Sequence, residues 1–256
     1  MEKTFERIDV AGQSTRVWRA GSGPDVVVLH GWGGRIESMA PVLDCLSTAF
    51  SVYAIDLPGF GEAPFPQGVW GTPDFAAFTR DTLAHLGIAR AHFVGHSFGG
   101  KVSLYLAAVH RDLVDKLVLV DATGVRLPPS LETRAKKAAA RAARAMGKAG
   151  PLGKSLKDAV YARLGSNDYR DAGPIRPILV RVVNEDYQTF LPRIESSTLL
   201  VWGDQDEATP IAMGRVMEQQ IPDAGLVVFE GAGHFSYLDD PERFCRVVRF
   251  FLGAPL

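Results

Sequence analysis

Hydrophobic residues in this chain gather in short runs, and segments with a helical pattern separate most of those runs. From residue 25 onward the runs are nearly continuous in Val, Leu, Ile and aromatic residues, which is typical of strands covered by helices on both faces. We predict eight strands, at residues 5–10, 15–20, 25–30, 50–56, 91–96, 116–121, 198–203 and 225–230. The first two have no helical pattern between them, so we expect an antiparallel hairpin at the sheet edge.

Helical patterns follow the later strands at residues 36–49, 72–87, 97–112, 209–220 and 240–253. Thr72 and Pro73 provide a helix start and Gly87 a stop. Strands that alternate with helices indicate an α/β fold with a mostly parallel sheet. We therefore predict an eight-stranded, mostly parallel sheet flanked by helices.

One segment breaks this alternation. Between the sixth and seventh strands, three helical patterns occur at residues 131–150, 155–165 and 175–194, broken by Gly and Pro. A crossover between parallel strands needs only about a dozen residues. The excess predicts a helical cap at 125–192, inserted after strand 6 and placed over one end of the sheet. We expect the rest of the chain, residues 1–124 and 193–256, to form the core. Core and cap together make a single domain, 1–256.

Composition places the chain among ordinary globular proteins. It has 256 residues, 46% of them hydrophobic and 22% charged, and a net charge of −1. That charge gives no global attraction to nucleic acid or to anionic membranes. The apolar runs are too short to span a bilayer, and the N-terminus lacks the apolar stretch of a signal peptide. We expect Cys45 and Cys245 to be free thiols in a reducing compartment, and the protein to be cytoplasmic.

Reactive side chains follow several of the predicted strands. Ligands bind beyond the carboxyl ends of strands in open α/β sheets. Ser97 follows the fifth strand, Asp121 ends the sixth, Asp204 and Asp206 follow the seventh, and His234 follows the eighth. A serine, a carboxylate and a histidine at one end of a sheet are the components of a nucleophilic triad.

The glycines around Ser97 indicate a sharp turn. Gly95, Ser97 and Gly99 form G-x-S-x-G, which Gly100 extends. A strand-to-helix turn of this kind strains the serine backbone, and neighbouring side chains would clash there. The turn also places the hydroxyl at a helix N-terminus, where backbone N–H groups favour a developing negative charge.

On four motifs, the sequence resembles the α/β-hydrolase family over nearly its whole length. They are "HGWGG" after the third strand, "GHSFGG" after the fifth, "GDQD" after the seventh and "GAGHF" after the eighth. "AIDLPGFGEA" is similar to the family turn D-x-P-G-x-G-x-S, with Ala63 where serine is common. The resemblance implies the α/β-hydrolase fold and the family order of nucleophile, acid and histidine.

The resemblance also implies a role for each site residue. Ser97 would attack an acyl carbon, and His234 would take its proton and later deliver it to the leaving group. Asp206 would orient His234, because the family's acid usually stands three residues beyond the glycine that ends the seventh strand. Asp121 is the alternative acid, since some relatives carry the acid after the sixth strand. Asp204 is the third choice, because it is better suited to holding the turn.

The same resemblance implies an oxyanion hole formed by the backbone N–H groups of Trp32 and Phe98. We expect no cofactor and no metal. No His/Cys/Glu cluster has metal-ligand spacing, and the glycines near Ser97 do not form a phosphate-binding loop.

These features predict a serine hydrolase that cleaves carboxylic esters of small to medium acyl groups through an acyl-enzyme. One alternative is a C–C bond hydrolase of the meta-cleavage-product type, although "HGWGG" lacks the longer Gly/Ser-rich loop with Asn that those enzymes usually have. Haloalkane dehalogenases and epoxide hydrolases need a carboxylate where Ser97 stands. A small-molecule receptor on the same fold is the non-enzymatic alternative.

The expected partner is a small-molecule ester, with no nucleic acid and no membrane, and nothing in the sequence indicates an oligomeric state. Residues 134–157 carry eight Lys and Arg residues and no acid. We expect a solvated helix face there. The alternative is a surface that steers anionic substrates or rests on an acidic partner.

Overall fold

The computed structural model describes residues 3–128 and 173–254. Most of the predicted cap, 125–192, and all of the basic run at 134–157 lie outside the described residues. The chain divides into two compact units, of which the first comprises residues 1–126 and 181–256 and the second residues 127–180. The sheet and the residues described below as the candidate site all belong to the first unit.

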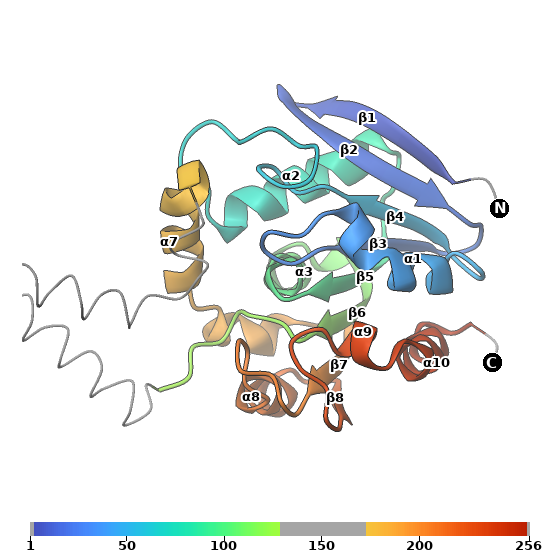
Figure 1. Ribbon diagram of the computed structural model, residues 1–256, viewed down its shortest axis with the longest axis vertical. Coiled ribbons are helices and arrows are strands. Elements are labelled where there is room, and N and C mark those ends of the chain that lie inside the picture. The colour runs from blue at the N-terminus through green and yellow to red at the C-terminus, as the bar shows by residue number, and fades with distance from the viewer. Residues whose placement is uncertain (1–2, 129–172, 255–256) are drawn as a thin grey trace, which may run out of the picture. The chain divides into compact units, whose positions relative to one another are not determined.

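Eight strands form one sheet in the order β1-β2-β4-β3-β5-β6-β7-β8 (Figure 1). Their bounds are β1 (Thr4–Val10), β2 (Gln13–Ala20), β3 (Asp25–Leu29), β4 (Ser51–Ile55), β5 (Ala91–His96), β6 (Val114–Val120), β7 (Ser197–Gly203) and β8 (Ala224–Phe229). β2 pairs antiparallel with β1 and β4, and the pairs from β4 to β8 are parallel. This confirms the predicted mostly parallel sheet and its edge hairpin.

Most described helices lie within the predicted helical patterns, but the pattern at 175–194 is divided into several helices and the short helix at Ser236–Asp239 was not predicted. The predicted helices at 131–150 and 155–165 lie outside the described residues. Among the described residues the α-helices are α1 (Ala40–Leu46), α2 (Thr72–His85), α3 (Phe98–Val109), α7 (Arg176–Asn184), α8 (Ala212–Gln220), α9 (Ser236–Asp239) and α10 (Pro241–Leu252). Short 3-10 helices are η1 (Ile36–Met39), η2 (Arg111–Leu113), η3 (Gly173–Ile175) and η4 (Gln188–Arg193). α8 begins three residues later than predicted, because Thr209 bonds to a carboxylate instead of starting the helix.

Helices cover both faces of the sheet. α1, α9 and α10 pack together on one face, and α2, α3 and α8 lie on the other (Figure 1). β4 and β5 are buried along their whole length, as expected for strands covered on both sides. The core on the α1 and α10 side contains alternate strand residues, among them Val26 and Val28 of β3. Burial on both faces holds the strands in place, and the residues of the candidate site follow the ends of these strands.

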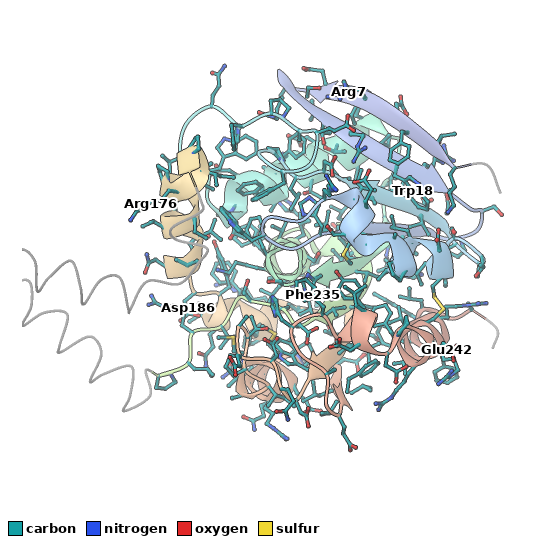
Figure 2. All side chains as sticks on the ribbon, viewed as in Figure 1. Arg7, Trp18, Arg176, Asp186, Phe235 and Glu242 are labelled. Carbon is teal, nitrogen blue, oxygen red and sulfur yellow. A yellow bond between two sulfur atoms is a disulfide. The ribbon has the colours of Figure 1, made fainter. Side chains whose placement is uncertain are left out.

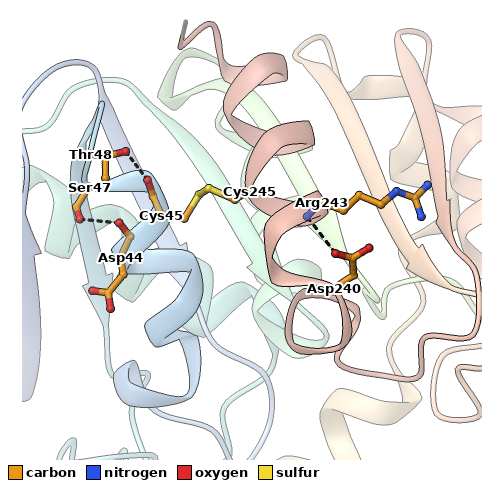
Figure 3. The surroundings of a disulfide bond; sticks show 7 residues. All are labelled: Asp44, Cys45, Ser47, Thr48, Asp240, Arg243 and Cys245. Atoms are coloured by element: carbon orange, nitrogen blue, oxygen red, sulfur yellow. Dashed lines mark hydrogen bonds between the residues drawn. A yellow bond between two sulfur atoms is a disulfide. The ribbon is translucent and has the colours of Figure 1, made fainter. Parts of the chain in front are cut away.

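A disulfide joins Cys45 of α1 to Cys245 of α10 (Figure 3). The prediction that both cysteines are free was therefore wrong. Each cysteine has a helical pattern around it, but the sequence does not reveal that these two helices, 200 positions apart, lie side by side. The cysteines no longer support a reducing compartment. Within residues 3–128 and 173–254, no helix combines the length and apolar character that a membrane crossing needs.

Candidate active site

Ser97 occupies the turn between β5 and α3. Its backbone is left-handed, with φ of 51° and ψ of −110°, which is strained for a residue with a side chain. Two hydrogen bonds hold the conformation: the Ser97 N–H donates to the Val120 carbonyl, and the Thr123 N–H donates to the Ser97 carbonyl. The strained turn directs the serine out of the sheet at the start of α3.

The glycines provide clearance for this turn, as the sequence predicted. A Cβ at Gly95 would lie 2.5 Å from the Gly99 carbonyl oxygen, and one at Gly99 would lie 2.3 Å from the Leu29 carbonyl oxygen. A Cβ at Gly100 would lie 2.6 Å from the Ala122 side chain. Each contact is shorter than side-chain carbons tolerate. The motif is therefore a steric requirement of the close approach between β3, β5 and α3.

His234 reaches Ser97 from the loop between β8 and α9. Its Nε2 lies 3.0 Å from the Ser97 Oγ, and its Nδ1 lies 2.8 Å from Oδ2 of Asp206. An ionised carboxylate only accepts hydrogen bonds, so Nδ1 carries the proton and Nε2 is free to accept one. The three side chains come from loops after β5, β7 and β8, and they form one hydrogen-bonded series.

Asp206 is held on its other side by its own loop. Its Oδ1 accepts the backbone N–H groups of Ala208 and Thr209 at 2.8 and 2.9 Å, and the Thr209 hydroxyl donates to Oδ2. Burial alone would raise the pKa of the Asp206 carboxyl, but hydrogen bonds from His234 and Thr209 outweigh it and lower the pKa. Asp206 is therefore ionised at neutral pH and aligned with the imidazole.

The other two candidate acids bond elsewhere. Asp204 is exposed and accepts the Gly231 N–H at 2.7 Å, which holds the turn as expected. Asp121 is fully buried, and its carboxylate accepts hydrogen bonds from Gly203 and Ser236. Among the described residues, neither carboxylate hydrogen-bonds to His234, so the geometry brings only Asp206 to the imidazole.

Trp32 and Phe98 lie on two loops that meet beside Ser97. Trp32 follows β3, and Phe98 is the first residue of α3. Their rings pack edge to face with centroids 5.4 Å apart, and Phe60 packs 4.8 Å from Trp32. Within the described part of the chain, no hydrogen bond occupies the backbone N–H of either residue. Both donors are thus available to an oxygen atom of a ligand.

Two buried histidines fix the surrounding loops. The His30 Nδ1–H donates to the Gly31 carbonyl at 2.8 Å, and its Nε2 accepts the Leu57 N–H at 3.0 Å. The His96 Nε2–H donates to the His234 carbonyl at 2.8 Å. Burial lowers the pKa of His96 to about 4, so this ring is neutral at physiological pH. These contacts tie both histidine side chains to backbone groups of the loops around the site.

Phe235 follows His234 in the loop after β8 (Figure 2). The residue is 47% exposed, and its ring centroid lies 5.1 and 5.3 Å from those of His96 and His234. An accessible aromatic surface therefore lies directly beside the imidazole that contacts Ser97.

Sequence reasoning missed Thr209 and Ser236. The Thr209 Oγ lies 3.3 Å from Nδ1 of His234 and also contacts Asp206 and the Asp121 carbonyl. The available signal was the spacing Asp206-x-x-Thr209, typical of a carboxylate that accepts a nearby backbone N–H. Ser236 carried no such signal, because its partner Asp121 lies 115 positions away.

The site combines a hydroxyl, an imidazole and a carboxylate side chain. Within the described residues, no group of three or more His, Cys, Asp and Glu side chains is arranged to hold a metal ion. What the arrangement offers is a hydroxyl beside a neutral imidazole nitrogen, an ionised carboxylate behind the imidazole, and two backbone donors nearby. These groups are suited to nucleophilic attack on a carbonyl carbon.

Known proteins resemble this chain in sequence. The sequence profile of the alpha/beta hydrolase family matches residues 26–247. A pimeloyl-acyl-carrier protein methyl ester esterase from Chromobacterium violaceum is 34% identical, covering 89% of this chain and 94% of that protein.

Two solved structures share the fold. A bacterial membrane phospholipase A has a TM-score of 0.78 and 25% identity, covering 98% of this chain and 86% of its own. A meta-cleavage product hydrolase from Pseudomonas fluorescens has a TM-score of 0.73 and 22% identity, covering 96% of this chain and 97% of its own.

Proposed function

The chain belongs to the α/β-hydrolase family, and from that premise we propose that it is a serine hydrolase that cleaves carboxylic esters through an acyl-enzyme. One observation carries the proposal: Ser97 Oγ, the two nitrogens of His234 and the Asp206 carboxylate form an unbroken hydrogen-bonded series, at 3.0 and 2.8 Å. That series supplies a nucleophile, a base and an orienting acid in the required order.

The reaction follows from the proton positions. Ser97 Oγ attacks the ester carbonyl carbon while its proton passes to Nε2 of His234. The imidazolium then gives that proton to the departing alcohol, and the C–O ester bond breaks to leave an acyl-Ser97. In the second half a water molecule attacks the acyl carbon and loses its proton to His234. The bond between the acyl carbon and Ser97 Oγ then breaks, the imidazolium returns the proton to Oγ, and the carboxylic acid leaves. In both halves of the reaction, Asp206 stabilises the imidazolium by accepting the hydrogen bond from its Nδ1–H.

The negative oxygen of each tetrahedral intermediate needs donors that are in place beforehand. We assign the backbone N–H groups of Trp32 and Phe98 to this role. Two observations support this assignment. Neither N–H group donates a hydrogen bond within the described residues, and both lie on loops that flank Ser97. The partial positive charge at the start of α3 adds to the same field.

The relatives suggest which ester to assay first. Proteins named pimeloyl-acyl-carrier protein methyl ester esterase, from Chromobacterium violaceum and Neisseria meningitidis, are 34% and 31% identical to this chain over nearly their whole lengths. We therefore propose a short alcohol, such as methanol, as the leaving group, and an acyl chain of small to medium length. The meta-cleavage product hydrolase is alike in fold alone and adds no support for C–C cleavage.

A cytoplasmic location remains a proposal. The disulfide between Cys45 and Cys245 weighs against it, because disulfides persist mainly in oxidising compartments.

The test is an ester assay combined with covalent labelling. Wild-type protein is expected to hydrolyse p-nitrophenyl acetate and butyrate and methyl esters of dicarboxylic acids, and to bind a fluorophosphonate at Ser97, located by mass spectrometry. Ser97→Ala should abolish both, while Asp206→Asn should lower kcat by about 10⁴-fold. Labelling elsewhere, or full ester turnover by Ser97→Ala, would show that Ser97 is not the nucleophile.

A further inference from the structure

Asp121 is a buried carboxylate that the proposed reaction does not use. It is the first residue after β6, with no solvent exposure and a left-handed backbone φ of 45°. Its Oδ1 accepts the Gly203 N–H at 2.9 Å. Its Oδ2 accepts the Ser236 N–H at 3.0 Å and the Ser236 hydroxyl at 2.7 Å. All three of these hydrogen bonds come from two other segments of the chain.

Those two segments carry the groups that must meet. Gly203 ends β7, three residues before Asp206, and Ser236 begins α9, two residues after His234. One carboxylate therefore ties the acid loop to the histidine loop. The Asp121 backbone lies close by as well, since its carbonyl oxygen is 2.9 Å from the hydroxyl oxygen of Thr209, whose proton goes to Asp206.

This position requires a carboxylate and not only a polar group. Two donors of Ser236 converge on one oxygen while Gly203 occupies the other. An asparagine amide would turn its NH₂ toward either the Gly203 N–H or the Ser236 N–H, and in both orientations a donor would face a donor. Keeping a buried carboxylate ionised is costly, and burial raises the pKa of Asp121 to about 6, with the charge of Asp206 adding to the effect.

We propose that Asp121 is a positioning residue whose ionised carboxylate holds the loops after β7 and β8 together so that Asp206 and His234 meet in reactive alignment. The inference rests on the proposed serine-hydrolase function. It assigns Asp121 a role distinct from that of the acid, because Asp121 acts on the imidazole through the two loops and not by contact.

The proposal has a pH consequence. As pH falls through 6, one oxygen of Asp121 takes up a proton and becomes a poorer acceptor for the donors of Gly203 and Ser236. One of the contacts that hold the two loops together is then lost. The titratable groups that interact with the Asp121 charge are Asp206 and the phenol of Tyr237, whose pKa burial and the Asp121 charge raise to about 12. Tyr237 therefore stays neutral in this range, and Asp206 stays ionised.

The effect on stability has the opposite sign. The folded-state pKa of Asp121 lies above the ordinary value of 3.8, so the folded protein binds this proton more tightly than the unfolded chain does. Protonation of Asp121 therefore favours folding as pH falls from about 6 to 3.8. Between pH 6 and 3.8, protonation of Asp121 should therefore lower the activity without lowering the free energy of unfolding.

The experiment compares Asp121→Asn, Ser236→Ala and Asp204→Asn in p-nitrophenyl butyrate hydrolysis between pH 5 and 8, with thermal unfolding of each variant. Asp204→Asn is the matched control, because Asp204 also joins the loops after β7 and β8 but is exposed. Asp121→Asn should lower kcat about 10- to 100-fold with little change in KM. Its acidic limb should move to lower pH, because the limb no longer includes the titration of Asp121. Ser236→Ala should lower kcat less, and Asp204→Asn should match the wild type.

Several results would overturn the proposal. Asp121 would be the acid itself if Asp121→Asn were as inactive as Ser97→Ala while Asp206→Asn stayed active. An unshifted pH profile would reduce Asp121 to a structural residue, as would equality with Asp204→Asn. If Asp121→Asn does not fold, Ser236→Ala decides the matter: wild-type kcat and pH profile in that variant would contradict the proposal. Activity in Ser97→Ala would instead contradict the proposed function, whatever Asp121 does.

Discussion

The absence of a side chain at Gly99 is a condition for the whole site. A Cβ there would meet two backbone carbonyl oxygens of the β3 end, at 2.3 Å for Leu29 and 2.6 Å for His30. Backbone atoms cannot rotate away as a side chain can, so β3 and α3 would have to separate. Such a shift moves Trp32 away from Ser97, because His30 and Trp32 belong to the same loop.

We therefore expect Gly99→Ala to lower the free energy of unfolding by about 1–3 kcal/mol and to reduce ester hydrolysis strongly. Gly225→Ala in β8 is the control, since nothing lies within 4 Å of a Cβ there. That variant should be as active as the wild type and up to about 1 kcal/mol more stable. Thermal unfolding and p-nitrophenyl butyrate turnover measure both effects. Equal behaviour of the two variants would contradict the steric account.

At the residue scale, the sequence supplied the residues that carry a motif or follow a strand. Ser97, Asp206 and His234 follow strands whose carboxyl ends meet at one sheet edge, and the structure brings their side chains into contact. The role of Ser236 was not predictable, because its contact with Asp121 joins residues 115 positions apart. Thr209 offered a signal in its spacing from Asp206, but its approach to His234 depends on how the two loops meet in the fold.

At the element scale, α3 is joined to the end of α7 by a buried lysine. Lys101 lies one turn beyond Ser97 and is only 3% exposed. Its Nζ donates to the carbonyls of Val182 at 2.7 Å and Glu185 at 3.3 Å. Carbonyls at a helix C-terminus lack intrahelical partners, and a cation there is favourable. Burial lowers the pKa of Lys101 to about 8, so the ammonium form predominates at neutral pH.

Lys101→Met should therefore lower the free energy of unfolding by about 1–3 kcal/mol, because the Glu185 carbonyl loses its ammonium donor and the buried Val182 carbonyl keeps only the Glu185 N–H. Faster hydrogen exchange is expected at residues 181–187, next to the lost contact. Lys3→Met is the control: Lys3 pairs with Asp44 on the surface, where both side chains are more than half exposed, and its loss should change stability by less than about 1 kcal/mol. An unchanged exchange rate at 181–187 would show that Lys101 does not hold this segment.

Strands were more predictable than helix ends. The eight strands appear within about two residues of their apolar runs. For the central strands, β3 to β7, burial on both faces leaves a nearly continuous apolar signal. The start of α8 was misplaced because Thr209 and Pro210 resemble a helix start in sequence. In the structure, both the Thr209 N–H and its hydroxyl bond to Asp206, and the helix begins only at Ala212.

At the scale of the whole molecule, the least predictable contact joins segments from opposite ends of the chain. α1 and α10 lie side by side because both cover the same face of the sheet, and the Cα atoms of Cys45 and Cys245 are 5.9 Å apart (Figure 3). Apolar periodicity shows that each helix has a buried side but not which helix it meets. A pair of cysteines in separate helices therefore gave no indication of a disulfide.

The disulfide closes a loop of 200 residues and should be a large stabilising contact. In the chain-entropy model a cross-link of that length stabilises by about 5 kcal/mol, through the unfolded state. We expect reduction with dithiothreitol, or the double substitution Cys45→Ser and Cys245→Ser, to lower Tm by more than about 5 °C. Ester hydrolysis at 25 °C should be retained, because α1 and α10 still pack through Leu46, Val248 and their neighbours.

Alkylation of cells before lysis, followed by mass spectrometry, tests where in the cell the protein is located. Alkylated cysteines would support the cytoplasm, and an intact disulfide would point to an oxidising compartment.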